Sequence, residues 1–76
     1  MYVLRDPEPD KWTRLAISCR YLGSLPVCDV PSSLLARKLV VAIVSRGYAY
    51  LYECPGSYAP ERLGATQAYS LTELGC

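Results

Sequence analysis

The sequence predicts a small α+β domain in which an antiparallel sheet, centred on a hairpin at residues 39–54, packs against a C-terminal helix. A run of mainly β-branched residues from Val40 to Val44 leads into the turn Ser45-Arg46-Gly47, after which Tyr alternates with Ala and Leu. Segment 60–74 instead carries apolar residues at helical spacing. At 76 residues, 51% of them apolar and 20% charged, the chain has the size and composition of a single small domain, 1–76.

The N-terminal part begins with residues 1–10, which we expect to form a loop or a short edge strand because they are acidic and interrupted by prolines. Segment 11–22 fits two periodicities. As a helix it is capped by Asp10 and ends before Gly23. As a strand it alternates Leu15, Ile17, Cys19 and Tyr21 with small or polar residues. Periodicity alone leaves both structures open.

The middle of the chain is broken by Pro26 and Pro31, and a serine at position 32 or 33 can cap a helix of about two turns before the hairpin. Beyond the hairpin, Pro60 suits the first turn of a helix and Gly75 suits the position after its end. We therefore predict one helix over residues 60–74.

The chain contains no histidine, and its formal net charge is +1. It therefore lacks the commonest general base and the commonest metal ligand. Its carboxylates form no pair in an apolar setting, and no glycine-rich phosphate loop is present. We expect no enzymatic activity, no cofactor and no metal. The small net charge provides no field to steer nucleic acid, which argues against nucleic-acid binding.

Location and cysteine chemistry follow from the same composition. Residues 1–10 do not resemble a signal peptide, and the longest apolar run, 39–44, is far shorter than the ~20 residues that span a bilayer. We expect a cytoplasmic protein without a membrane span. The four cysteines are spaced too irregularly for zinc. They would allow three disulfide pairings in a secreted chain, but nothing else indicates export, and we expect reduced thiols.

The alternation after the turn places Tyr48, Tyr50 and Tyr52 on one side of their strand. Such a row of phenols suits a binding surface better than catalysis. The alternative is structural: the same face packs under the C-terminal helix with its hydroxyls at the rim. Trp12 poses a similar choice between an interface anchor and a large core residue, and core is favoured in a chain without Phe.

Two blocks of the sequence resemble phosphotyrosine-binding (PTB) domains. The stretch PEPDKWTRLAISCRYLGSLPV, residues 7–27, is similar to the family's opening strand, which ends in a YLGS-like turn. Residues 48–54, followed by 57–63 and 67–69, are similar to its last strand and C-terminal helix, with Tyr69 where the family usually has phenylalanine. The family's long intervening helix and several central strands have no counterpart here, so the resemblance implies a shortened or partial form.

In that family a peptide adds as an extra strand to the sheet edge beside the C-terminal helix. The resemblance implies that residues 48–52 offer the edge and that Leu63, Tyr69 and Leu71 line the groove. Arg46 is the arginine nearest to the family's phosphate-binding position, although it is displaced by about one residue.

We therefore expect a module that binds a protein or an extended peptide, with dimerisation through an edge strand as a further possible mode. A competing hypothesis is a small regulatory protein that binds and blocks a larger protein without a peptide groove. A third is a nucleic-acid binder that uses four basic residues, Arg14, Arg20, Arg37 and Lys38.

Overall fold

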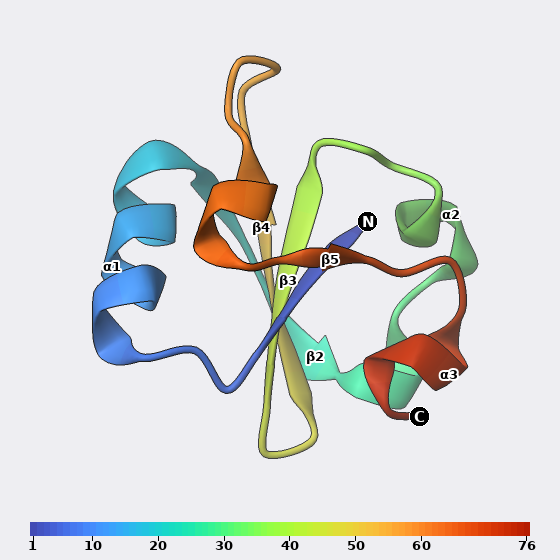
Figure 1. Ribbon diagram of the computed structural model, residues 1–76. Coiled ribbons are helices and arrows are strands. Elements are labelled where there is room, and N and C mark those ends of the chain that lie inside the picture. Colours follow the sequence, from blue (N-terminus) through green and yellow to red (C-terminus); the bar gives the residue numbers. More distant parts are fainter.

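The computed structural model describes residues 1–76, which form one mixed sheet with helices on both of its faces (Figure 1). Its strands are β1 (Tyr2–Arg5), β2 (Arg20–Pro26), β3 (Val40–Ser45), β4 (Tyr48–Glu53) and β5 (Thr66–Gln67). Its α-helices are α1 (Pro9–Ser18), α2 (Ser32–Leu35) and α3 (Leu71–Leu74). Two short 3₁₀ helices are η1 (Val27–Asp29) and η2 (Pro60–Leu63).

The five strands lie in the order β2-β4-β3-β1-β5. Only β1 and β3 run parallel, with Tyr2 beside Val41. The other neighbouring strands are antiparallel. The predicted fold class, a small α+β domain with a mostly antiparallel sheet and a C-terminal helix, is confirmed.

The central hairpin forms as the alternation predicts. Ser45 pairs with Tyr48, which leaves Arg46 and Gly47 as the two turn residues. Both have positive φ, 54° and 81°. This is the backbone of a type I′ turn, whose twist matches that of the flanking strands. The hairpin therefore brings two central strands of the sheet together over six residue pairs.

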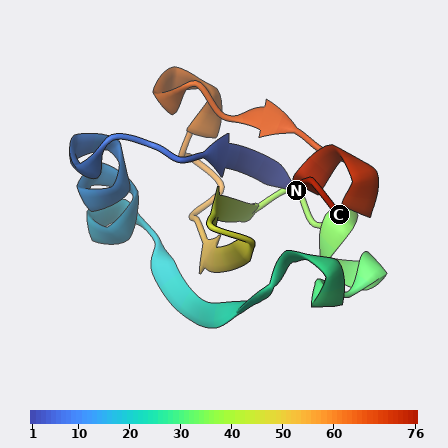
Figure 2. The same cartoon turned by 90° about the horizontal axis from the view of Figure 1, so that it is seen from below.

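Each face of the sheet carries its own apolar cluster, because side chains along a strand alternate between the two faces. Figure 2 shows α1 and η2 on one side of the sheet and α2 and α3 on the other. The cluster under α1 includes Leu15, Val41 and Ile43, all fully buried. The opposite cluster includes Val40 and Leu74, also fully buried.

The ambiguous segment 11–22 is helix and strand in succession. Helix α1 begins at Pro9, with Glu8 rather than Asp10 at its N-cap, and ends at Ser18. Strand β2 starts two residues later. Residues 1–10 do contain a short strand, β1, but it lies inside the sheet between β3 and β5 rather than at an edge.

The predicted single helix over 60–74 was wrong. Gly64 adopts φ 89° and ends the 3₁₀ turn η2 after one turn. The chain then pairs briefly with β1 through β5 before α3 begins. The Ser70 hydroxyl caps α3 by accepting a hydrogen bond from the Glu73 N–H. Of the predicted C-terminal helix, only α3 at residues 71–74 is α-helical.

All four cysteines are paired, so the expectation of reduced thiols was wrong. Cys19 is bonded to Cys54, and Cys28 is bonded to Cys76. The first disulfide joins the residue before β2 to the residue after β4, and the second joins η1 to the residues after α3. Each closes a long loop, with sequence separations of 35 and 48.

None of the helices has the length and apolar character that a membrane crossing requires.

Candidate functional site

The tyrosine row predicted as a binding edge lies on an interior strand. Strand β4, which carries it, is hydrogen-bonded to β2 on one side and to β3 on the other. Its backbone is therefore closed to an added strand. Along the row exposure falls steeply: Tyr48 is 47% exposed, Tyr50 is half-buried and Tyr52 is only 6% exposed.

Helix α1, not the C-terminal helix, covers this row. The Trp12 indole N–H donates a hydrogen bond of 3.0 Å to the Tyr52 hydroxyl. The same indole lies 5.0 Å from the Tyr50 ring, and Tyr21 lies 5.2 Å from Tyr52, both in tilted arrangements. These geometries are favourable for aromatic pairs. Tyr50 and Tyr52 thus serve mainly to hold α1 and β2 against β4, and Tyr48 alone remains largely exposed.

The structure does not assemble the other predicted groove residues into one groove. Leu63 is buried in the cluster under α1, whereas Leu71 packs against the cluster on the opposite face of the sheet. Tyr69 is 70% exposed, and its hydroxyl donates to the Gln67 side chain at 2.6 Å. Arg46 is exposed at the hairpin turn.

The free edge of the sheet is β2. It pairs with β4 on one side and has no strand on the other, over seven residues. The opposite edge strand, β5, has only two residues. Sequence reasoning missed β2 as the edge, although a proline within a strand, here Pro26, is a recognised sign of an edge position.

The direction of the backbone groups along β2 follows from its neighbour. The Val27 N–H donates to the Gly47 carbonyl at 3.0 Å, so the backbone of residue 27 faces the hairpin. Because these groups point alternately to either side of a strand, those of Leu25 face β4 and those of Ser24 and Pro26 face outward. Proline is tolerated at an outward position because no ladder hydrogen bond is lost there. The exposed edge therefore offers the Ser24 N–H and C=O groups to a partner.

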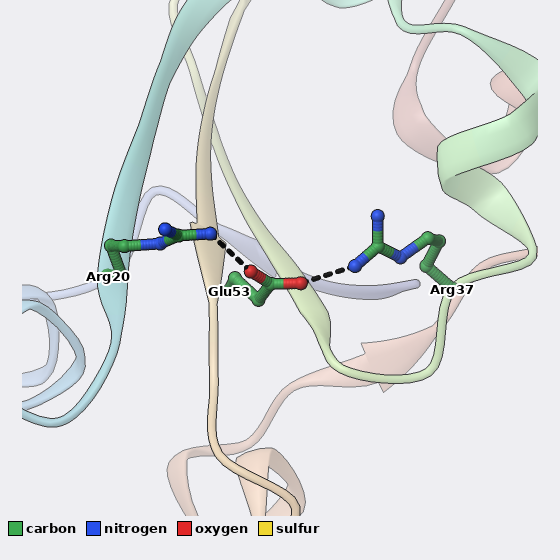
Figure 3. A network of polar contacts seen from close by, with 3 residues as sticks. All are labelled: Arg20, Arg37 and Glu53. Carbon is green, nitrogen blue, oxygen red and sulfur yellow. Dashed lines mark hydrogen bonds and ion pairs between the residues drawn. The ribbon is translucent and has the colours of Figure 1, made fainter.

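One end of β2 is fixed by a three-residue ionic network (Figure 3). Arg20 on β2 donates to the Glu53 carboxylate on β4 at 2.6 Å. Arg37, which follows α2, binds the other oxygen of the same carboxylate. Because Arg14 also pairs with Asp10, three of the four basic residues considered for nucleic-acid binding are paired with an acidic residue. The four residues therefore do not form one basic surface with unpaired charges.

Two tyrosines, Tyr58 and Tyr2, have a pKa above the ordinary value. Burial raises the pKa of Tyr58, partly opposed by the positive charge of Arg14. Burial also raises the pKa of Tyr2, and the hydroxyl's hydrogen bond of 3.1 Å to the Glu61 carboxylate acts in the same direction. Both phenols therefore remain neutral donors at neutral pH. No group of three or more metal-ligating side chains is found in the molecule.

Comparisons of this chain with protein-family models, with curated proteins and with solved structures found no match.

Proposed function

We propose that this chain is a protein-interaction module that binds an extended peptide by adding it as a strand to the outer edge of β2. The observation that supports the proposal is the edge itself: β2, a strand of seven residues, has a neighbouring strand on one side only. Unpaired backbone N–H and C=O groups in such a row are a template for another strand. In strand addition these main-chain groups provide the affinity, and side-chain contacts provide the selectivity.

The side chains along β2 suit a partially apolar peptide. Tyr21 and Leu22 are 52% and 42% exposed, although both are large and apolar. Tyr48, exposed on the neighbouring strand beside Pro26, extends the same surface at its other end. A peptide with apolar residues at its two ends would cover these side chains while its middle pairs with Ser24.

The edge also carries features that limit indiscriminate pairing. The register of β2 against β4 shifts between Tyr21 and Gly23, which marks a bulge. Bulges and prolines are devices by which natural sheets restrict edge-to-edge association. We therefore expect selective binding over a few residues around Ser24 rather than pairing along the full strand.

The test compares two substitutions at one position. A displayed library of random peptides is selected against the unmodified protein, and the selected peptides are then measured against Ser24→Pro and Ser24→Ala. Proline removes the outward N–H and adds a ring at the edge, so we expect binding to fall at least about tenfold. Alanine keeps the backbone intact and should leave affinity within about a factor of two.

Circular dichroism and thermal melting of both variants check that the fold is retained. The proposal is wrong if the selected peptides bind Ser24→Pro as tightly as the unmodified protein. It is also wrong if peptide addition leaves the amide exchange rate of Ser24 unchanged. A selection that yields no peptide binder favours the alternative of a small regulatory protein without a peptide groove.

The two disulfides bear on where such a module works. Disulfides form and persist in oxidising compartments and are rare in the cytosol. Since both cross-links are present here, we infer that the protein works outside a reducing cytosol rather than in the cytoplasm expected from composition. Fractionation of the source cells, with the thiol state measured by mass spectrometry, distinguishes the two locations.

A further inference from the structure

A cavity of about 490 Å³ lies between α1 and the segment 57–63, and no residue of β2 lines it. Arg14 and Ile17 line it from the helix, and Tyr58, Arg62 and Leu63 line it from the opposite side. Cavities that bind small organic molecules commonly have volumes of 300–1,000 Å³ and combine apolar walls with a few polar groups. Its size and lining match that description.

The charged residues that line this cavity are both arginines, and no carboxylate lines it. Arg14 pairs with Asp10 at 3.3 Å, in an exposed contact within one helix. Arg62 takes part in none of the three ion pairs of the molecule. Its neighbour Glu61 accepts the Tyr2 hydroxyl instead. Because the charge of Asp10 offsets that of Arg14, the rim of the cavity has one positive charge, that of Arg62, without a balancing carboxylate.

The rest of the lining is apolar and partly uncovered. Ile17 is 80% exposed, the most exposed of the large hydrophobic side chains, whereas Leu63 is buried in the cluster under α1. Tyr58 packs against the same cluster and also lines the cavity. An apolar group in the cavity would therefore contact Leu63 and Tyr58 and remove Ile17 from water.

We propose that this cavity binds a small organic monocarboxylate, with the carboxylate on Arg62 and Arg14 and an apolar body against Ile17, Leu63 and Tyr58. The planar guanidinium group matches a carboxylate and binds it through two parallel hydrogen bonds. A single negative charge neutralises the one uncompensated positive charge of the rim. The apolar body of the ligand would cover the exposed Ile17 side chain, whereas a small anion without an apolar body would leave it in water.

The experiment measures binding of three probes by calorimetry. Phenylbutyrate carries both the charge and the apolar body, phenylbutanol lacks the charge, and acetate lacks the apolar body. We expect phenylbutyrate to bind at least about tenfold more tightly than either of the others, since a hydrogen bond to a charged group and the burial of a phenyl ring each contribute on this scale. Amide NMR shifts should locate the effect at α1 and residues 57–63.

Two arginine variants separate this cavity from general charge effects. Arg62→Gln should weaken phenylbutyrate binding at least about tenfold, because an arginine–carboxylate pair is lost. Arg46→Gln removes an exposed arginine at the hairpin turn, outside the cavity, and should leave binding unchanged. The proposal is overturned if phenylbutanol binds as tightly as phenylbutyrate, if Arg62→Gln has no effect, or if both variants weaken binding equally.

Discussion

At the scale of single residues, the tyrosines of β4 change role along the strand. Tyr52 is nearly buried and accepts a hydrogen bond from Trp12, whereas Tyr48 is 47% exposed and makes no side-chain hydrogen bond. Sequence alternation correctly places the three phenols on one face, since period two is a local property. It does not show which of them α1 will cover, because that depends on packing between elements distant in sequence.

The contrast between these tyrosines predicts different costs for the same substitution. Tyr52→Phe removes the acceptor of the Trp12 indole N–H and should lower the free energy of unfolding by about 1 kcal/mol, within the range for a lost, partly buried hydrogen bond. Tyr48→Phe should change it by less than about 0.5 kcal/mol. Urea unfolding followed by tryptophan fluorescence measures both. Equal effects of the two substitutions would show that the Trp12–Tyr52 hydrogen bond contributes nothing to stability.

At the scale of elements, the sequence predicts best where the signal is local. The hairpin follows from alternation and from Gly47 in its turn. Periodicity could not assign segment 11–22 to either a helix or a strand, because α1 ends and β2 begins within it. The predicted helix over 60–74 spans Gly64, but this glycine adopts φ 89° and ends η2 there. Glycine just after the last helical residue is a helix-ending signal, and sequence reasoning overlooked it at Gly64.

The same local reasoning predicts how the hairpin turn can be improved. Arg46 adopts φ 54°, a conformation that asparagine tolerates better than arginine. Arg46→Asn should therefore raise the free energy of unfolding by about 0.5 kcal/mol without altering the fold. Gly47→Ala, at φ 81°, should lower it by about 1 kcal/mol as the opposite control. A lower stability of Arg46→Asn would contradict the assigned turn type.

At the scale of the whole molecule, features that depend on distant segments were the least predictable. The free edge falls on β2 because the sheet order places β4 inside, and no local pattern specifies that order. The disulfide pairing likewise cannot be deduced from the positions of four cysteines. The candidate binding edge and the cross-links therefore emerged only from the three-dimensional structure.

The two disulfides should respond differently to a mild reductant. Cys19 and Cys54 are buried, whereas Cys28 and Cys76 are exposed. Because exchange requires access of a thiolate to the sulfur, we expect the Cys28–Cys76 bond to open first. Each cross-link contributes about 4 kcal/mol in the chain-entropy model, and loss of both should unfold much of the population. Alkylation at increasing times, followed by mass spectrometry and thermal melting, measures the order and the effect.

Alkaline pH should destabilise the protein through Tyr2 and Tyr58. The pKa of each lies above its ordinary value of 10.0 in the folded state, chiefly because of burial. When the pH lies between 10.0 and the raised pKa of the folded state, the folded protein keeps protons that the unfolded protein releases. The free energy of unfolding therefore falls as pH rises above 10.0. The double variant Tyr2→Phe/Tyr58→Phe should lose less stability over the same interval in urea titrations. An unchanged pH dependence would exclude these two phenols as its cause.

The position of β1 between β3 and β5 has a consequence for the rate of folding. Tyr2 pairs with Val41 on one side and with Gln67 on the other, so the strand nearest the N-terminus is completed only by distant parts of the chain. Chains dominated by such non-local pairing fold slowly, in milliseconds to seconds. The β3–β4 hairpin, by contrast, needs a turn of only two residues. We therefore expect the hairpin to form early and β1 to dock late, after most of the chain has already collapsed around it.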